Sequence, residues 1–419
     1  MYVLYEVLLY LVLLLALPYF LLTGVLRGKY LANFPERMGS YRTRPEAHDL
    51  WIHAVSVGET LAARWVVAEI LRQRPGTSIV ITTTTITGQA QARRLFPDAM
   101  VTYFPFDFAF AVRRFLDHHQ PRAFVTMETE IWPNVTRLAR ARGMRLMLAN
   151  GRISDRSLPR YRAFRAIVGS VLRKYDRILA REETDRVRFI AIGAPEQVVE
   201  VSGNVKFDYE PDSAPLEIAP RLESLIGGRK VLVLGSTMEG EDELLLPEIE
   251  RFLAEQNAFV IIAPRKPERF ELVAGLLGTS SLRFVRRSEL HVFHDGAQAD
   301  ILLLDTLGEL ARIYRYASVA FIGGTLVPMG GHNPIEPAAT GVPVCFGPSM
   351  SAFRETAQVF LRNQAAQVVK SAAEVIDFAE KMLEDPELQR AWGERARDTV
   401  RQNRGASERT ARRIVELLA

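Results

Sequence analysis

The sequence has little of several features that mark common classes of protein. Only one cysteine occurs among 419 residues, which excludes an internal disulfide and a cysteine-rich metal site. That residue, Cys345, lies in the apolar run VPVCFG, where a small buried side chain is expected. The chain has no P-loop, no G-x-S-x-G nucleophile elbow and no Asp-X-Asp triplet of the kind that holds a metal ion on a nucleotide diphosphate. We therefore expect neither a metal nor another cofactor.

An excess of charge of one sign is absent as well. The 53 lysines and arginines face 49 acidic residues, giving a formal net charge of +4, and no long basic block occurs. Nucleic acid is therefore not an expected partner, whereas a mildly basic chain suits an anionic substrate or a membrane surface. With 48% hydrophobic and 24% charged residues, the composition is globular, and the length predicts two domains.

A long hydrophobic run lies at the N-terminus. Residues 1–22 carry a single charge, Glu6, and about 20 apolar residues are enough to span a bilayer as a helix. We expect residues 1–25 to anchor the chain to a membrane, although a buried N-terminal helix is the alternative. Glu6 and Pro18 leave open whether the anchor spans the bilayer or lies in one leaflet. Basic residues follow the run, unlike in a cleaved signal peptide, and by the positive-inside rule they place the remaining chain in the cytoplasm: Arg27, Lys29, Arg37, Arg42 and Arg44.

Short apolar runs alternate with segments of helical periodicity through the rest of the chain. In the first half the predicted strands are Leu50–Val55, Ile79–Thr83, Val101–Phe104, Phe124–Met127, Arg145–Ala149 and Arg177–Ala180. The alternation restarts after the proline-rich segment 209–220, with the runs KVLVLGS, FVIIAP, ILLLD, VAFIGG and PVCFG. It predicts parallel sheets covered by helices on both faces. We expect an α/β protein with domains at 26–208 and 221–419, a linker at 209–220 and a cleft between the domains; the last helix is a candidate to pack back on the first domain.

Acidic side chains follow two of the predicted strands, and ligands bind beyond the carboxyl ends of strands in such sheets. Glu59, in the segment HAVSVGET, would lie at the start of a helix, where it can act as a general base or only complement the positive helix N-terminus. Glu128 and Glu130 lie in METEIWPN. Two carboxylates in one loop repel each other unless a polar or cationic group joins them, so we expect at least one of them to have a partner. Helix capping and ordinary solvation are the alternatives.

Groups suited to binding anions lie in three other loops. Lys206, in SGNVKFD, could neutralise a phosphate or merely be a surface lysine. Pro264 and Arg265 follow the strand FVIIA, where a guanidinium can clamp a phosphate or carboxylate. The segment DTLGEL is predicted to begin a helix, with the backbone N–H groups of Leu307 to Glu309 directed at an anion.

The most specific segment is FIGGTLVPMGGHNPIEPAATGVPVCFGP. Its glycine pairs permit close backbone approach to a ligand, and Asn333 and Pro334 suit the cap and first turn of a helix. Glu336, one turn further on, could accept hydrogen bonds from the two hydroxyls of a ribose. His332 could be a donor, but a capping or packing role is an equal alternative.

In these loops the sequence resembles the transferases of Kdo (3-deoxy-D-manno-octulosonic acid) that act in lipopolysaccharide synthesis. The carriers of the resemblance are HAVSVGET, METEIWPN, NVKFD, PERF, GEL and GGHNPIEP, in the family's order. The resemblance extends over essentially the whole chain. It implies a GT-B glycosyltransferase fold, in which two Rossmann-like domains face each other across a cleft.

The resemblance also implies a reaction and roles for residues. CMP-Kdo would be the donor and a lipid A precursor, lipid IVA, the acceptor, at the cytoplasmic face of the bacterial inner membrane. Glu59 would be the general base of an inverting displacement, with Glu128 and Lys206 stabilising the transition state. The residues implied to bind CMP are Pro264, Arg265, Leu307, Gly308, Glu309, Asn333, Pro334, Ile335 and Glu336. The family commonly has histidines where Met238 and Lys266 stand here, so no role of those histidines carries over.

Two other interpretations remain open. A sugar-nucleotide epimerase or hydrolase of the same fold would need no lipid acceptor and would release free sugar. A membrane-tethered nucleotide-binding or scaffold protein would bind CMP without turnover.

Overall fold

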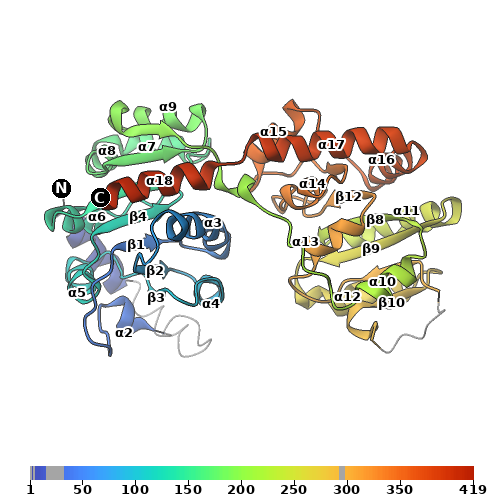
Figure 1. The fold of residues 1–419 in the computed structure, drawn as a ribbon, viewed down its shortest axis with the longest axis horizontal. Helices are drawn as coiled ribbons and strands as arrows, with labels where there is room; N and C mark the ends of the chain where they lie inside the picture. The colour runs from blue at the N-terminus through green and yellow to red at the C-terminus, as the bar shows by residue number, and fades with distance from the viewer. Residues whose placement is uncertain (1, 3–4, 16–32, 292–297) are drawn as a thin grey trace. The chain divides into compact units, whose positions relative to one another are not determined.

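The computed structural model describes residues 2, 5–15, 33–291 and 298–419. The chain divides into two compact units, residues 1–208 with 404–419 and residues 209–403 (Figure 1). Segment 209–220 contributes buried Leu216 and Ile218 to the core of the second unit.

The first unit is built around a parallel sheet of seven strands in the order β3-β2-β1-β4-β5-β6-β7. The strands are β1 (Leu50–His53), β2 (Ile79–Thr83), β3 (Met100–Tyr103), β4 (Ala123–Met127), β5 (Arg145–Gly151), β6 (Arg177–Ala180) and β7 (Val199–Val201). The helices are α2 (Phe34–Arg37), α3 (Val57–Gln73), α4 (Ile86–Leu95), α5 (Ala109–His119), α6 (Pro133–Ala141), α7 (Leu158–Ala163), α8 (Arg165–Leu172), α9 (Glu183–Ala191) and α18 (Ala406–Leu418), with 3-10 turns η1 (Glu196–Val198) and η2 (Val205–Asp208).

The second unit repeats this plan, with strand order β10-β11-β9-β8-β12-β13-β14. Its strands are β8 (Lys230–Thr237), β9 (Ala258–Pro264), β10 (Phe284–Arg286), β11 (Ile301–Leu303), β12 (Val319–Ile322), β13 (Val344–Phe346) and β14 (Ala366–Val368). Its helices are α10 (Ala219–Ile226), α11 (Glu241–Glu255), α12 (Phe270–Leu277), α13 (Leu310–Ile313), α14 (Ile335–Ala339), α15 (Arg354–Arg362), α16 (Ala372–Glu384) and α17 (Pro386–Gln402), with 3-10 turns η3 (Pro267–Arg269), η4 (Arg287–Glu289) and η5 (Tyr314–Tyr316).

Both faces of each sheet are buried, which explains why the strands read as continuous apolar runs. In β1, Trp51 packs in one core cluster whereas Leu50 and Ile52 pack in the cluster on the other face. Every residue of β2, β4 and β9 is buried. Cys345 is fully buried in β13, as expected for a small apolar residue.

Helix α18 belongs to the first unit although it ends the sequence. Its apolar side chains, among them Ala411 and Ile414, enter the core cluster that contains α3. Asp208 at the end of η2 accepts hydrogen bonds from the backbone N–H groups of Gly405 and Ser407, each at 2.5 Å. This carboxylate caps the start of α18 and ties it to the segment that carries Lys206.

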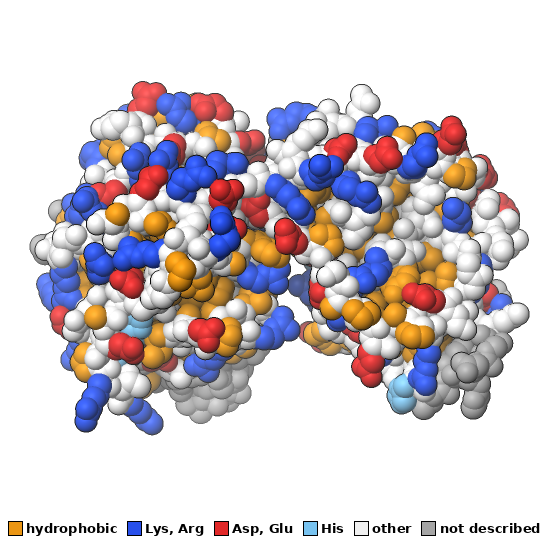
Figure 2. All heavy atoms as spheres, viewed as in Figure 1, with side chains coloured by type: hydrophobic (Ala, Val, Ile, Leu, Met, Phe, Trp, Pro, Cys, Tyr) orange, Lys and Arg blue, Asp and Glu red, His pale blue; other side chains and the backbone are white. Residues whose placement is uncertain are grey.

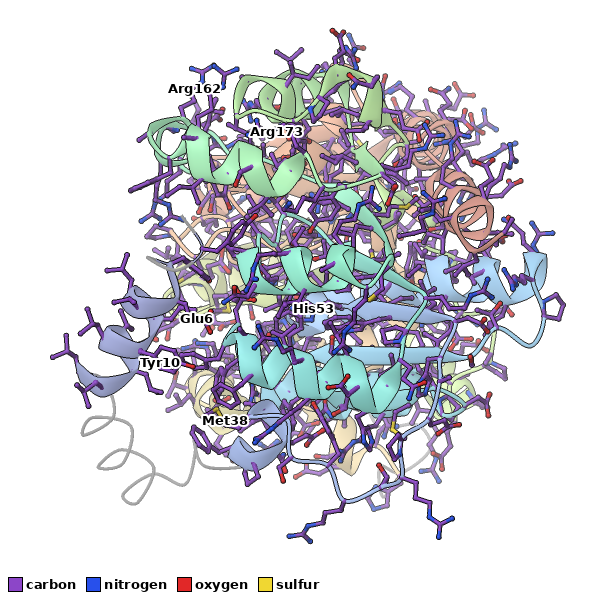
Figure 3. The ribbon with its side chains drawn as sticks, turned by 90° about the vertical axis from the view of Figure 1, so that its left-hand side faces the viewer. Glu6, Tyr10, Met38, His53, Arg162 and Arg173 are labelled. Atoms are coloured by element: carbon purple, nitrogen blue, oxygen red, sulfur yellow. The ribbon has the colours of Figure 1, made fainter. Side chains whose placement is uncertain are left out.

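Residues 5–15 are helical and pack on the first unit through one side. The Tyr5 hydroxyl donates to Asp107 at 2.8 Å, and the Glu6 carboxylate accepts from the backbone N–H of Ala109 at 3.0 Å. Glu6 and Tyr10 lie between this helix and the body of the unit, whereas side chains on its other side point away (Figure 3). The exposed apolar residues on that other side are Val7, Leu8, Leu11, Val12, Leu14 and Leu15.

Within the described residues, no helix combines the length and the apolar character required to cross a bilayer. Residues 16–25 of the predicted anchor lie outside the described residues. The anchor therefore stays a prediction. Lys and Arg side chains are interspersed with Asp and Glu on the face of the molecule drawn in Figure 2.

Candidate active site

The strand order of the first unit reverses between β1 and β4, and this switch point is where ligands bind in open parallel sheets. Glu59 lies in the first turn of α3, the helix that follows β1, and Glu128 directly follows β4. β1 and β4 are adjacent and in register from Leu50–Ala123 to His53–Thr126. The topology therefore brings two predicted site residues, far apart in the sequence, to one edge of the sheet.

Glu59 caps α3 and also has an unusual proton affinity. Its carboxylate accepts from the backbone N–H of Val55 at 2.7 Å and from the Ser56 hydroxyl at 3.2 Å. Burial, together with the nearby charges of Glu128 and Glu130, raises its pKa from 4.5 to about 7. The hydrogen bonds give Glu59 a structural role at the start of α3, and its role as a general base stays a prediction.

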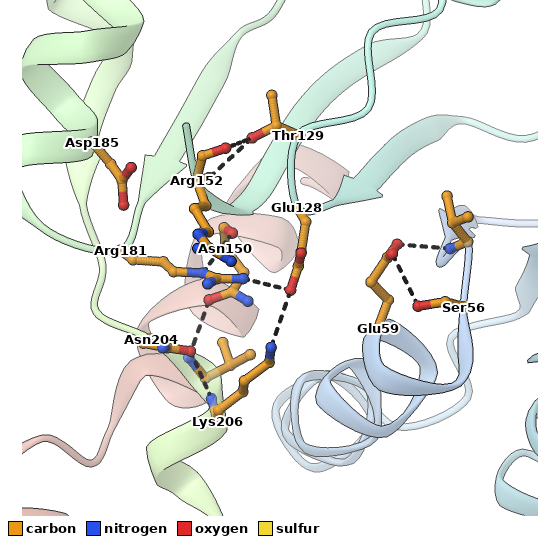
Figure 4. A network of polar contacts seen from close by, with 12 residues as sticks. Ser56, Glu59, Glu128, Thr129, Asn150, Arg152, Arg181, Asp185, Asn204 and Lys206 are labelled. Carbon is orange, nitrogen blue, oxygen red and sulfur yellow. Dashed lines mark hydrogen bonds and ion pairs between the residues drawn. The ribbon is translucent and has the colours of Figure 1, made fainter. Parts of the chain in front are cut away.

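Glu128 is held by cations in a strained backbone position. Its φ of 57° lies in the left-handed region, which is uncommon for a non-glycine residue. The carboxylate pairs with Arg181 at 2.5 Å and with Lys206 at 3.5 Å (Figure 4). Burial opposes ionisation, but the charges of Arg181, Lys206 and Arg152 hold the pKa of Glu128 below its usual value. One carboxylate of this loop thus has partners, and both are cations.

Lys206 is partly exposed and lies beside Glu128. It lies in η2, with 23% of its side chain exposed. Its backbone N–H donates to the side chain of Asn204 at 3.1 Å. Burial lowers the pKa of Lys206, and the charge of Glu128 opposes this effect. Glu130 is not one of the partners in the ion pairs described for Glu128. Burial and the charge of Glu128 raise the pKa of Glu130 to about 7.

Arg181 is a charged residue of this cluster that the motif analysis missed. It directly follows β6, and only 4% of its side chain is exposed. Its Nε donates to the backbone carbonyl of Asn150 at 3.1 Å. The available signal was the rule already applied to Glu128, namely a charged residue at the carboxyl end of a predicted strand.

The second unit has its own switch point, between β8 and β12. A Cβ atom at Gly323, which follows β12, would lie 2.5 Å from the Ser236 carbonyl oxygen of β8. Glycine is therefore required here because β8 and β12 pack closely. From the sequence, the close approach of a ligand was the expected reason for the glycine pairs.

Glu241, also missed in the sequence, organises the loop that follows Gly323. This fully buried carboxylate at the start of α11 accepts from the backbone N–H groups of Gly324 at 2.5 Å, Thr325 at 2.8 Å and Leu326 at 2.9 Å. It also accepts from the N–H of Met238 at 3.0 Å. The carboxylate thus occupies these backbone donors and fixes the conformation of the loop.

Asn333 and Glu336 lie together at the start of α14. The Asn333 side chain donates to Glu336 at 3.2 Å and accepts from the N–H of Ile335 at 3.1 Å. The helix begins at Ile335 with Pro334 as its cap. Burial raises the pKa of Glu336, while its bond to Asn333 and the charge of Arg265 act in the opposite direction.

His332 and Arg265 complete this part of the second unit. Burial, and then the charge of Arg265, lower the pKa of His332 to about 4, so that its ring is neutral at physiological pH. Arg265 follows Pro264, the last residue of β9, and its side chain is exposed. An exposed guanidinium near Glu336 and His332 is placed to meet an anionic ligand.

The predicted segment Leu307 to Glu309 lies in a turn before the helix. Helix α13 begins at Leu310, later than the sequence suggested, with Glu309 as its cap. The Glu309 carboxylate accepts from Arg287 at 2.8 Å and from the Thr306 hydroxyl. Leu307 is 62% exposed. Over the described ranges, no group of three or more His, Cys, Asp or Glu side chains is arranged to hold a metal ion.

Comparison with known proteins places this chain among sugar transferases. Residues 32–209 match the family model of 3-deoxy-D-manno-octulosonic-acid transferase (kdotransferase). A 3-deoxy-D-manno-octulosonic acid transferase of Haemophilus influenzae is 33% identical over 394 residues, which cover 93% of this chain and 92% of that protein. The corresponding protein of Bordetella pertussis is 35% identical over 384 residues, covering 89% and 88%.

Solved structures show the same fold at low sequence identity. A glycosyltransferase from Rickettsia africae superposes with a TM-score of 0.57 and 13% identity, covering 90% of this chain and 98% of that one. UDP-GlcNAc 2-epimerase from Neisseria meningitidis gives a TM-score of 0.57 and 12% identity, covering 89% and 99%. These likenesses concern the fold alone, and they confirm the expected pair of Rossmann-like α/β domains of the GT-B type.

Proposed function

This chain belongs to the 3-deoxy-D-manno-octulosonic acid (Kdo) transferase family, and we propose that it moves Kdo from CMP-Kdo to a hydroxyl group of the lipid A precursor lipid IVA. The reaction is a step of lipopolysaccharide biosynthesis. The observation that carries the proposal is the pair of carboxylates at the switch point of the first unit. Burial and nearby carboxylates raise the pKa of Glu59 to about 7, whereas Glu128 is paired with Arg181 and Lys206, which help to hold its pKa below its usual value.

In the proposed step Glu59 is the general base. The acceptor hydroxyl transfers its proton to the Glu59 carboxylate, and the oxygen forms a bond to the anomeric carbon of Kdo. The bond between that carbon and the phosphate oxygen of CMP breaks, and its electron pair leaves with CMP as a phosphate monoester. A general base is most effective when its pKa lies near the operating pH, and a pKa of about 7 fits this role. A single displacement inverts the configuration at the anomeric carbon and needs no covalent enzyme intermediate.

In this proposal, cationic side chains offset negative charge on the reacting groups. Lys206, held beside Glu128, offsets negative charge as the transition state forms. In the second unit Arg265 offsets charge on the CMP phosphate, and Glu336 accepts from the ribose hydroxyls. The remaining segments proposed to bind CMP are Pro264, Leu307 to Glu309 and Asn333 to Ile335.

We further propose that the N-terminal helix holds the protein at the cytoplasmic face of the bacterial inner membrane. The apolar residues on its outer side, from Val7 to Leu15, are between 48% and 79% exposed, whereas Glu6 bonds to the unit itself. A helix with an exposed apolar side of this kind can bury that side in the membrane interface. Such an anchor keeps the site near an acceptor that cannot leave the bilayer.

A transfer assay with matched variants tests the catalytic proposal. The full-length chain is incubated with CMP-Kdo and a tetra-acylated lipid A precursor, and the lipid is analysed by mass spectrometry. Glu59→Gln is compared with Glu69→Gln, a glutamate of the same helix that pairs with Arg72. We expect Glu59→Gln to lose transfer by a factor of about 10² to 10⁴ and Glu69→Gln to match the wild type. Near-normal transfer by a folded Glu59→Gln variant would show that Glu59 is not the base.

A further inference from the structure

The guanidinium of Arg181 is buried beside the carboxylate pair, and neither the motifs nor the family comparison assigns it a role. Its Nη2 lies 2.5 Å from the Glu128 carboxylate, its Nε donates to the Asn150 carbonyl at 3.1 Å, and 4% of its side chain is exposed. Arginine pairs of this kind are stronger than neutral hydrogen bonds and fix geometry. A buried charge is costly unless it is paired, so Arg181 and Glu128 depend on each other.

Arg181 also connects two segments of the site. The backbone of Asn150, which accepts from the guanidinium, has a left-handed φ of 56°. The side chain of this asparagine accepts from the N–H of Val205 at 3.3 Å, one residue before Lys206. Figure 4 shows Arg181, Asn150 and Lys206 arranged around Glu128. The position of Glu128 relative to Lys206 therefore depends on Arg181 through side-chain and backbone contacts.

The balance of charge gives Arg181 a second effect. Glu128 carries one negative charge, whereas Arg181 and Lys206 carry two positive charges within 3.5 Å of it. Without Arg181 the remaining close pair, Glu128 with Lys206, would be neutral. The charge of Lys206 would then be neutralised by Glu128, and less positive charge would be available to an anionic substrate.

We infer that Arg181 is a positioning residue: it holds Glu128 as an ionised carboxylate and so keeps the positive charge of Lys206 directed at the anionic group of the substrate. The inference rests on the proposed function for the identity of that substrate. The other charged groups that act on Glu128 are Arg152, which follows β5, Glu59 on α3 and Glu130 in the same loop. Asp185, drawn nearby in Figure 4, accepts from the N–H of Ile153 at 2.9 Å.

The experiment measures the titration of Glu128 separately from turnover. The full-length chain is labelled with ¹³C at glutamate carboxyl groups, and the Glu128 resonance is assigned by its loss in Glu128→Gln. Arg181→Met, Arg181→Lys and the control Arg186→Met are then titrated, and kcat and KM for transfer are measured on the same samples. Arg186 is a matched arginine of α9 whose partners are Glu183 and Glu196, both at 2.7 Å.

We expect Arg181→Met to move the titration of Glu128 to higher pH and to lower kcat about 100-fold, as for a misplaced reacting group. Arg181→Lys should restore the ionisation and much of kcat, and Arg186→Met should match the wild type in both measurements. If Arg181→Met does not fold, the comparison uses Arg181→Gln against Arg181→Lys, and the double variant Arg181→Met with Glu128→Gln should recover stability.

An unchanged titration of Glu128 in folded Arg181→Met, or a moved titration with unchanged kcat, would overturn the inference. If the wild type transfers no Kdo but Arg181→Met still moves the titration of Glu128 to higher pH, the proposed function would be wrong. In that case the structural link between Arg181 and Glu128 would stand.

Discussion

Replacing the proposed general base should make the protein more stable while it becomes inactive. In the folded chain the Glu59 carboxyl has a pKa of about 7, against an ordinary value of 4.5, because of burial and the charges of Glu128 and Glu130. The difference corresponds to about 3 kcal/mol, at 1.36 kcal/mol for each pKa unit. Ionised Glu59 therefore costs folding free energy, and Glu59→Gln removes that cost.

The sign of the effect fixes its dependence on pH. Below pH 4.5 Glu59 is protonated in both the folded and the unfolded chain, so its ionisation has no effect on stability. Between pH 4.5 and about 7 the folded chain binds more protons at this site than the unfolded chain, and stability falls as pH rises. Above pH 7 the full cost applies. The amide introduced by Glu59→Gln keeps one oxygen that can accept from the N–H of Val55, so the cap is retained in part.

The assay is urea denaturation of wild type and Glu59→Gln at several pH values between about 4 and 9. We expect Glu59→Gln to gain stability relative to the wild type as pH rises, by up to about 3 kcal/mol above pH 7, while transfer is lost. Glu69→Gln, a partly exposed position of the same helix, should follow the wild type at every pH. A difference between Glu59→Gln and wild type that does not change with pH would refute the reasoning.

Three further predictions concern packing and hydrogen bonds within the two units. Gly323→Ala should destabilise the chain by about 1 to 3 kcal/mol, because its Cβ would lie 2.5 Å from a carbonyl oxygen. Gly275→Ala on α12, where the new Cβ would meet nothing within 4 Å, should instead stabilise the chain by about 0.5 to 1 kcal/mol. Equal shifts of the thermal midpoint in the two variants would contradict both expectations. Glu241→Gln keeps one oxygen but loses the acceptor of two of the four backbone N–H groups and places an NH2 group against them. It should cost about 2 to 3 kcal/mol and weaken CMP binding in calorimetry, and an unchanged midpoint would show that the loop is held otherwise. Tyr5→Phe removes a hydrogen bond to Asp107, whose pKa burial raises to about 6. Because this bond favours the ionised form of Asp107, the variant should lose about 1 kcal/mol of folding stability, and the loss should be larger at pH 8 than at pH 5. A larger loss at pH 5 in denaturation experiments would contradict this.

The fold could be predicted from the sequence because both sheets are buried on both faces. Long internal strands such as Ile79–Thr83 and Ala258–Pro264 are continuous apolar runs, and their pattern and length predict buried strands. Strands β7, β10 and β14 were not predicted. Each has three residues and is only partly buried at the end of a sheet, so packing of neighbours and not an apolar run determines them.

The candidate site could be predicted only in part, for a physical reason. Glu59 and Glu128 follow strands whose carboxyl ends meet, so the topology rule was enough to group them. Arg181 also follows a predicted strand, so the same rule could have marked it as a candidate. Its pairing with Glu128, like the contacts of Glu241, depends on which strands are neighbours, and a single sequence does not contain that information. The pKa of Glu59 likewise depends on burial and on charges from another loop.

The central claim, transfer of Kdo to lipid, is tested most directly by one mass spectrum. The full-length chain is incubated with CMP-Kdo and a tetra-acylated lipid A precursor, and the lipid fraction is analysed. We predict that the precursor gains the mass of one or more Kdo units, and that the gain disappears with Glu59→Gln. Release of CMP and free Kdo with an unmodified lipid would contradict the account and would indicate a hydrolase or a different acceptor.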